Sequence, residues 1–199
     1  MHDMTTQPAR DPSSSSYYVT DAFYRDLVAQ FVDWQRDELV VADASERDRF
    51  RMLIEREARL LDQLKFDEWL AMYAPECIYW VPATTTGGDP RREVAISFDD
   101  RRRMEDRVYR LRTGYAWSQA PKSRTVRMVS NVEVFAGGEG ARMVRSNFLI
   151  SEFRPDGVRF LSGHCAHRFV EQGGHWLIAV RQVNLIDCDQ NLRNPSIII

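Results

Sequence analysis

The fold is decided by residues 124–187, which read RTVRMVSNVEVFAGGEGARMVRSNFLISEFRPDGVRFLSGHCAHRFVEQGGHWLIAVRQVNLID. Apolar and polar residues alternate here over four long runs, about 124–135, 142–154, 158–171 and 175–187. Such alternation is typical of strands with one buried face. The runs are separated by Gly137-Gly138-Glu139-Gly140, Arg154-Pro155-Asp156-Gly157 and Gln172-Gly173-Gly174, which have the composition of tight hairpin turns. The stretch therefore predicts an antiparallel meander.

The residues before this stretch have helical spacing instead. Phe23, Leu27, Phe31 and Trp34 predict an amphipathic helix from Thr20 to about Leu39, with Thr20 as its N-cap. A second helix is predicted after Ser45, where an acidic residue three positions past the cap gives a weak capping box. Its buried stripe consists of Phe50, Leu53, Ile54, Glu57, Leu60, Leu61 and Leu64. A third, short helix is predicted from Phe66 to Tyr73, before Pro75.

Two more strands are predicted, at 76–82 and 94–98. Asp99 and Asp100 then open a helix with the buried stripe Met104, Val108 and Leu111, and Gly114 ends it. Helices followed by a curled antiparallel sheet define an α+β fold whose helices cover one face of the sheet. We expect an N-terminal arm with an amphipathic helix over 1–45, flexible over 1–18, and a single domain over 46–199. Three isoleucines, 197–199, are expected to be buried against the sheet or a partner.

Composition excludes several classes of protein. The chain has 199 residues and a formal net charge of -2, so it lacks the basic field of a nucleic-acid-binding protein. It has no run of about 18 apolar residues and no apolar N-terminal leader, so we expect a cytoplasmic protein without a membrane span. Three cysteines do not suggest a disulfide framework. Residues 91–127 carry ten Arg and one Lys against five acidic residues, a charge separation that suits docking to another protein.

No complete catalytic or metal-binding motif is present in the sequence. His164-Cys165-Ala166-His167 contains the Cys-x-His half of a Rieske ligand set, but Cys-x2-His is missing. On a strand, His164 and His167 would also point to opposite faces. A pocket enclosed by the sheet and helices could still use Tyr79 or His164, with Asp62 or Asp187, as an acid–base pair. This alternative predicts a stand-alone isomerase or dehydratase that acts on a hydrophobic small molecule.

Several motifs, in one collinear order from about residue 46 onward, together resemble the small (beta) subunit of aromatic-ring-hydroxylating dioxygenases. They are Glu57-Ala-Arg-Leu-Leu-Asp62, Phe66-Asp-Glu-Trp-Leu70, Tyr79-Trp-Val-Pro82, Asp100-Arg101, Arg107-Val-Tyr-Arg-Leu111, Thr113-Gly-Tyr-Ala-Trp117, Pro121-Lys-Ser-Arg-Thr125, Asn131-Val132, Val144-Arg-Ser-Asn-Phe148, Trp176-Leu-Ile-Ala179 with Arg181, and Asn194-Pro-Ser196.

The resemblance implies a cone-shaped, strongly curved antiparallel sheet like that of nuclear transport factor 2, and a non-catalytic structural role. It implies no catalytic, cofactor-binding or metal-binding residue in this chain. The large (alpha) subunit would hold a Rieske 2Fe-2S cluster and a mononuclear non-haem iron, and would dihydroxylate an aromatic, possibly carboxylated, substrate with O2 and electrons from NADH. A trimer of beta chains within a hexamer of three alpha and three beta chains is expected.

A nucleic-acid adaptor is the third hypothesis for the function of this chain.

Aromatic and arginine residues dominate the energetics of protein interfaces. On that basis, eight residues are predicted to make subunit contacts: Tyr79, Trp80, Arg107, Arg110, Tyr115, Trp117, Arg124 and Asn131.

Overall fold

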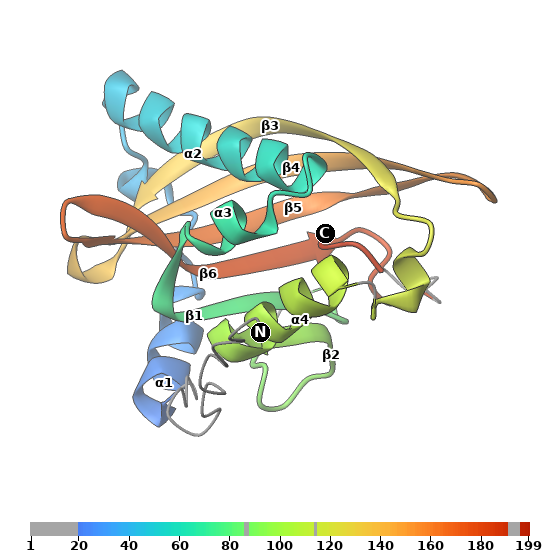
Figure 1. Cartoon of the computed structure of the whole chain (residues 1–199). Coiled ribbons are helices and arrows are strands. Elements are labelled where there is room, and N and C mark those ends of the chain that lie inside the picture. Colours follow the sequence, from blue (N-terminus) through green and yellow to red (C-terminus); the bar gives the residue numbers. More distant parts are fainter. Residues whose placement is uncertain (1–19, 86–87, 114, 191–195) are drawn as a thin grey trace, which may run out of the picture.

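A six-stranded sheet in the order β2-β1-β6-β5-β4-β3 forms the framework of the protein (Figure 1). The computed structural model describes residues 20–85, 88–113, 115–190 and 196–199. Its strands are β1 (Tyr73–Pro82), β2 (Ala95–Asp100), β3 (Arg124–Ala136), β4 (Arg142–Arg154), β5 (Gly157–Gln172) and β6 (His175–Leu185). Strands β3 to β6 pair antiparallel in chain order, so the predicted meander is confirmed. Strand β1 adds parallel to β6, and β2 adds antiparallel to β1.

Helices cover the inner, concave face of this curved sheet. They are α2 (Ala44–Asp62), α3 (Phe66–Leu70) and α4 (Arg101–Thr113), and they lie in front of the sheet in Figure 1. The main core lies between them and the sheet, and the predicted α4 stripe of Met104, Val108 and Leu111 is buried in it. The result is the predicted α+β cone. No helix within the described ranges is long and apolar enough to cross a membrane.

The first helix, α1 (Asp21–Gln30), lies on the other face of the sheet, so the prediction that all helices cover one face is wrong. Strand side chains alternate between faces, and Trp80 of β1 points outward because its neighbour Tyr79 points inward. Phe31, directly after α1, packs against Trp80 with ring centroids 6.4 Å apart. Trp34 meets Phe135 edge-on at 5.3 Å. An apolar stripe predicts that one side of a helix is buried, but it does not predict which face of the sheet that side packs against.

Several predicted helix ends are shifted. Helix α1 begins after Thr20, whose hydroxyl accepts the Phe23 N–H as predicted, but it ends at Gln30 rather than near Leu39. The described residues also form short 3-10 turns at η2 (Asp37–Leu39), η3 (Trp117–Gln119) and η4 (Gly138–Gly140). The N-cap of α2 is Asp43 rather than Ser45, because the Asp43 carboxylate accepts the Glu46 N–H at 2.6 Å.

Two predicted boundaries are wrong by a few residues for a clear reason. Helix α3 stops at Leu70 because Tyr73 already pairs with Ile178 of β6, which starts β1 three residues before the predicted position. Asp99 and Asp100 are the last residues of β2, and Asp100 caps α4 by accepting the Arg103 N–H at 2.9 Å. The predicted arm over 1–18 and the predicted end of a helix at Gly114 lie outside the described residues.

Candidate functional site at the mouth of the cone

A buried carboxylate, Glu57 of α2, is the centre of the cone's polar interior. Only 2% of Glu57 is exposed. Its oxygens accept hydrogen bonds from Trp69 Nε1 at 3.0 Å and from the Tyr73 hydroxyl at 2.8 Å. His167 Nε2 lies 3.0 Å from the second oxygen, and Arg181 Nε lies 3.5 Å from it. The predicted burial of Glu57 is therefore confirmed, and two strands supply the groups that compensate its charge.

The charges of this cluster follow from its surroundings. Burial by itself would raise the pKa of Glu57, but the Arg181 guanidinium and the hydrogen bonds from His167 and Tyr73 outweigh it and hold that pKa well below its usual range. Burial lowers the pKa of His167 despite the Glu57 hydrogen bond. The cluster is thus centred on a Glu57–Arg181 ion pair, with His167 Nε2 hydrogen-bonded to the same carboxylate.

The C-terminal residues 197–199 fill the space between this cluster and the opening of the cone. All three isoleucines are buried, as predicted. The Tyr79 hydroxyl donates to the Ile199 carbonyl and accepts the Ile199 N–H, both at 3.1 Å. The Arg127 guanidinium donates to the Ile198 carbonyl and is paired with Asp62. The tail is therefore fixed by main-chain hydrogen bonds as well as by apolar burial.

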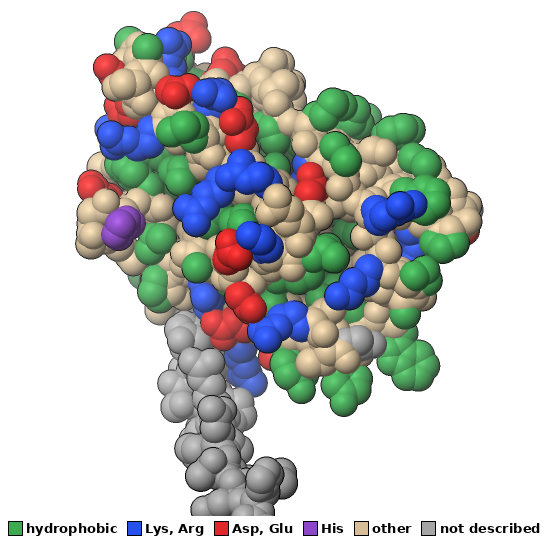
Figure 2. All heavy atoms as spheres, turned by 45° about the horizontal axis from the view of Figure 1, so that its top comes forward, with side chains coloured by type: hydrophobic (Ala, Val, Ile, Leu, Met, Phe, Trp, Pro, Cys, Tyr) green, Lys and Arg blue, Asp and Glu red, His purple; other side chains and the backbone are tan. Residues whose placement is uncertain are grey.

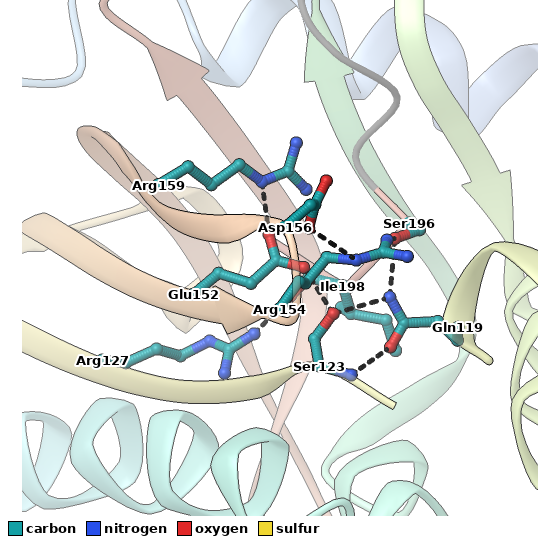
Figure 3. A network of polar contacts seen from close by, with 9 residues as sticks. All are labelled: Gln119, Ser123, Arg127, Glu152, Arg154, Asp156, Arg159, Ser196 and Ile198. Carbon is teal, nitrogen blue, oxygen red and sulfur yellow. Dashed lines mark hydrogen bonds and ion pairs between the residues drawn. The ribbon is translucent and has the colours of Figure 1, made fainter. Parts of the chain in front are cut away.

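A polar network anchors the same tail to the far ends of β3, β4 and β5 (Figure 3). Its buried centre is Glu152 of β4, which accepts the Ser123 hydroxyl at 2.5 Å and is ion-paired with Arg159. Gln119 Nε2 donates to Ser123 Oγ at 3.0 Å and to Ser196 Oγ at 2.6 Å. Because Ser196 directly precedes the tail, this network links the end of the sheet and η3 to the tail.

A pocket of about 380 Å³ remains above the tail, and we call it the mouth pocket. Tyr79 and the tail form its floor, α4 forms one wall, and η3 with the residues before it forms the other. It contains five of the eight residues predicted to make subunit contacts: Tyr79, Arg107, Arg110, Tyr115 and Trp117. None of the described lining residues is acidic, so the pocket is cationic and aromatic.

The other three predicted contact residues lie elsewhere. Trp80 is buried on the outer face beneath Phe31, and Tyr79 is also buried, so both belong to the core of this chain. Arg124 is exposed and stacks over the Phe153 ring at 4.4 Å. Asn131 is exposed at a bulge of β3, where its φ of 50° fits the left-handed preference of asparagine. A single chain does not test subunit contacts, so all eight assignments stay predictions.

Of the residues considered for acid–base chemistry, Tyr79 and Asp62 are each hydrogen-bonded to other groups. Tyr79 and His164 project from opposite faces of the sheet. Tyr79 lies in one cross-strand row with Arg181 and His167, whereas His164 lies in a row with Asn184. Arg181 and Asn184 are an odd number of residues apart on β6, so their side chains point to opposite faces. Asp62 is held by Thr125 at 2.8 Å and by Arg127. Within the described part of the chain, no three His, Cys, Asp or Glu residues are grouped so that they could hold a metal ion.

The outer face of the sheet carries an exposed apolar patch, which we call the sheet patch. One cross-strand row of this face consists of Arg124, Phe153 and Val158. The next row on the same face consists of Val126, Ser151 and Phe160. Figure 2 shows hydrophobic side chains at the right-hand end, where the β4–β5 hairpin lies. The members of the patch are Val126, Met128, Phe153, Val158, Phe160 and Ile186, with exposures between 41% and 74%. So many neighbouring apolar side chains favour an interaction surface.

Comparison with known proteins identifies the family. The family model described as "Ring hydroxylating beta subunit" matches residues 56–190, which include α3, α4 and the whole sheet. This chain belongs to the ring-hydroxylating beta subunits. The resemblance on which the sequence motifs rested is thereby confirmed, and the family match begins at the helix turn that carries Glu57.

Relatives of this beta subunit are named for dioxygenases of aromatic acids and of benzene or chlorobenzene. The small subunit of 2-halobenzoate 1,2-dioxygenase from Burkholderia cepacia is 41% identical over 104 residues, which are 50% of this chain and 63% of the relative. The beta subunit of benzoate 1,2-dioxygenase from Acinetobacter baylyi is 36% identical over 103 residues, 49% of this chain and 61% of the relative. The alignments thus span less than two thirds of these two curated relatives.

Solved structures support the same fold. The beta subunit of benzoate 1,2-dioxygenase from Burkholderia mallei superposes with a TM-score of 0.60 at 25% identity, covering 73% of this chain and 91% of that one. A chain of naphthalene 1,2-dioxygenase superposes with a TM-score of 0.68 at 18% identity over 91% of this chain and 95% of that one. At that identity the second similarity supports the fold alone.

Sequence reasoning missed the partners of Glu57 and the sheet patch. The signal for the first was present, because a glutamate in a buried helical stripe requires a cation or donors. His167 and Arg181 are directly opposite in the β5–β6 register, but this register becomes visible only in the folded sheet.

Proposed function

We propose that this chain is the non-catalytic structural beta subunit of a multicomponent aromatic-ring-hydroxylating dioxygenase. Its large subunit would dihydroxylate the aromatic ring with O2 and electrons derived from NADH. The observation that carries the proposal is the family match over residues 56–190. Because relatives are named for halobenzoate, toluate and benzoate, an aromatic carboxylate is the substrate class we propose for the complex.

The interior of the cone supports a structural rather than a catalytic role. Residues 197–199 occupy the space that a substrate would need, and the Tyr79 hydroxyl is already bonded to Ile199. Glu57 is compensated by Arg181 and hydrogen-bonded by three side chains. These contacts disfavour the alternative of a stand-alone isomerase or dehydratase, since the Tyr79 hydroxyl and the Glu57 carboxylate are both engaged within the chain.

The exposed surfaces support assembly. We propose that the sheet patch contacts further copies of this chain, giving the trimer expected of beta subunits within a hexamer of three alpha and three beta chains. Phe160 and Ile186 are 66% and 74% exposed in the single chain, and burial of such side chains would stabilise a self-complex by about 1.5–3 kcal/mol each. We place the Rieske 2Fe-2S cluster and the mononuclear iron in the large subunit, because the described residues here do not fit them.

The test is to express the chain alone and together with a large oxygenase subunit from the same organism. Native mass, iron content and visible absorbance are measured for both preparations. We expect an iron-free, colourless trimer from the chain alone, and a coloured complex of about six chains from the co-expression. A chain that stays separate from the large subunit, or that binds iron by itself, would refute the proposal.

A further inference from the structure

The mouth pocket has an unusual set of wall residues for a surface that faces water. Trp117 is 83% exposed, and Tyr115 and Tyr109 stack on each other with ring centroids 6.5 Å apart while both remain largely exposed. Tryptophan, tyrosine and arginine are the residues most enriched at the energetic centres of protein interfaces. Their gathering around one hollow favours a docking site.

The two arginines of the pocket differ in how they are used within the chain. Arg107 is ion-paired with Asp99 at 2.6 Å and donates to the Ser97 hydroxyl at 2.7 Å. Arg110 is exposed, and the contact recorded for its side chain is a long hydrogen bond of 3.4 Å to the Asp106 carbonyl of the same helix. The Arg110 guanidinium is therefore available for a carboxylate, and no acidic side chain lines the described part of the pocket.

The floor and walls define what fits beside that carboxylate. Leu111, Val81, Ile96 and Ile197 give the pocket an apolar lining, and its volume of about 380 Å³ accepts two or three side chains. The exposed aromatic surface also extends beyond the pocket, onto Tyr109 along α4 and outward at Trp117. A single-ring molecule in the pocket would leave that extension in water, whereas a protein segment would cover it.

We infer that the mouth pocket receives a segment of the large oxygenase subunit that carries a carboxylate side chain next to an apolar one. Arg110 pairs with the carboxylate, Leu111 and Ile197 contact the apolar side chain, and Trp117 packs over the segment. This inference rests on the proposed function, since it takes the large subunit as the partner. Two kinds of chain in one assembly need two kinds of interface, and the aliphatic and phenylalanine-rich sheet patch is unlike this cationic, aromatic pocket.

The test compares full-length variants co-expressed with the large subunit. Arg110→Glu reverses the charge, Trp117→Ala removes the aromatic cover, and Arg112→Glu is the matched control on the same helix. Arg112 does not line the pocket and is bonded to Asp67 at 2.9 Å. Arg107→Ala is a poorer test, because it also breaks the Asp99 contact within the chain. Circular dichroism and thermal unfolding verify that each variant is folded.

Binding of the large subunit and self-association are measured separately, the first by surface plasmon resonance and the second by sedimentation velocity. We expect Arg110→Glu and Trp117→Ala each to weaken binding of the large subunit by about tenfold or more, as loss of an interface anchor does. Arg112→Glu should bind like the wild type, and self-association should be unchanged in all three variants.

Three results would overturn the inference. The first is wild-type binding of the large subunit by both pocket variants. The second is loss of self-association, which would make a second copy the occupant. The third is saturable quenching of tryptophan fluorescence by benzoate in the isolated chain that is lost in Trp117→Ala and is abolished by Arg110→Glu without any effect on assembly. Failure of the wild-type chain to bind the large subunit is a separate result, which refutes the proposed function itself and the inference with it.

Discussion

Replacing Glu57 with glutamine tests whether the polar interior is a balanced ion pair. The substitution keeps the shape of the side chain and one acceptor oxygen, so Trp69 and Tyr73 retain a partner. It removes the negative charge and places an amide where Arg181 and His167 now meet a carboxylate oxygen. The Arg181 guanidinium then remains buried without a counter-ion.

The expected cost follows from that uncompensated charge. Removing one partner of a buried ion pair costs about 3–5 kcal/mol. For a chain of this size, each kcal/mol lowers the melting temperature by roughly 2–4 °C, so we expect a decrease of roughly 10 °C. Glu55→Gln is the matched control on the same helix, because Glu55 makes an exposed pair with Arg51 at 2.6 Å, and exposed pairs contribute about 0–1 kcal/mol.

Urea unfolding at pH 7 and at lower pH measures both the magnitude and its origin. The pKa of Glu57 is lowered in the folded state, so its stabilisation is complete above the ordinary value of 4.5 and is lost as pH falls toward the folded value. The acid limb below pH 4.5 should therefore be shallower in Glu57→Gln than in the wild type. A cost at pH 7 below about 1 kcal/mol, similar to that of Glu55→Gln, would refute the ion-pair argument.

Three further predictions concern the tail, the sheet patch and a buried thiol. Ile198→Ala should lower the free energy of unfolding by about 2–5 kcal/mol, while Ile186→Ala, at an exposed position, should change it by less than about 0.5 kcal/mol; denaturant titration of both variants decides this. Phe160→Ser should reduce self-association in sedimentation velocity without loss of stability. Val94 is also exposed but lies outside the sheet patch, so Val94→Ser should leave self-association unchanged. Trimers that persist in Phe160→Ser would contradict the proposed interface. Burial raises the pKa of Cys77 to about 12, so the contribution of the neutral thiol to stability is present below the ordinary value of 9.0. Above pH 9.0 this contribution is lost by up to about 1.4 kcal/mol per pH unit. Urea midpoints at pH 8 and 10.5 should therefore fall more in the wild type than in Cys77→Ala, and parallel pH profiles of the two proteins would exclude this contribution.

The sequence was most informative where one physical pattern determined the structure locally. Alternation over 142–154 predicted the bounds of β4, because a period of two residues fits a half-buried strand and no helix. Turn chemistry was equally local: Gly173 and Gly174 adopt φ values of 58° and 77°, which glycine accepts without steric cost. Helix ends were less predictable, since Trp34 continues the apolar spacing of α1 after the helix has ended at Gln30.

Contacts between distant segments were beyond the reach of these patterns. The stripe of α2 indicated that Glu57 is buried, but the register that places His167 opposite Arg181 depends on the folded sheet. The five predicted contact residues that meet in the mouth pocket were selected because aromatic and arginine residues dominate interface energetics. They converge only because the inner face of β1, the second half of α4 and η3 close on the same opening. The sequence was sufficient to select these aromatic and arginine residues as interface candidates. Only the structure showed that five of them meet in one pocket.

The tail fills the interior that a cone of this kind could otherwise offer to a ligand. A curved sheet with helices on its concave face encloses a space that either binds a ligand or is filled by the chain. Here Ile198 and Ile199 fill it, and the hydrogen bonds of Tyr79 and Arg127 to their main chain satisfy polar groups that a ligand would otherwise have to satisfy. What remains open to a partner is the cationic mouth above the tail and the apolar outer face of the sheet. In the proposed assembly both surfaces bind proteins: the mouth pocket receives a segment of the large subunit, and the sheet patch contacts further copies of this chain.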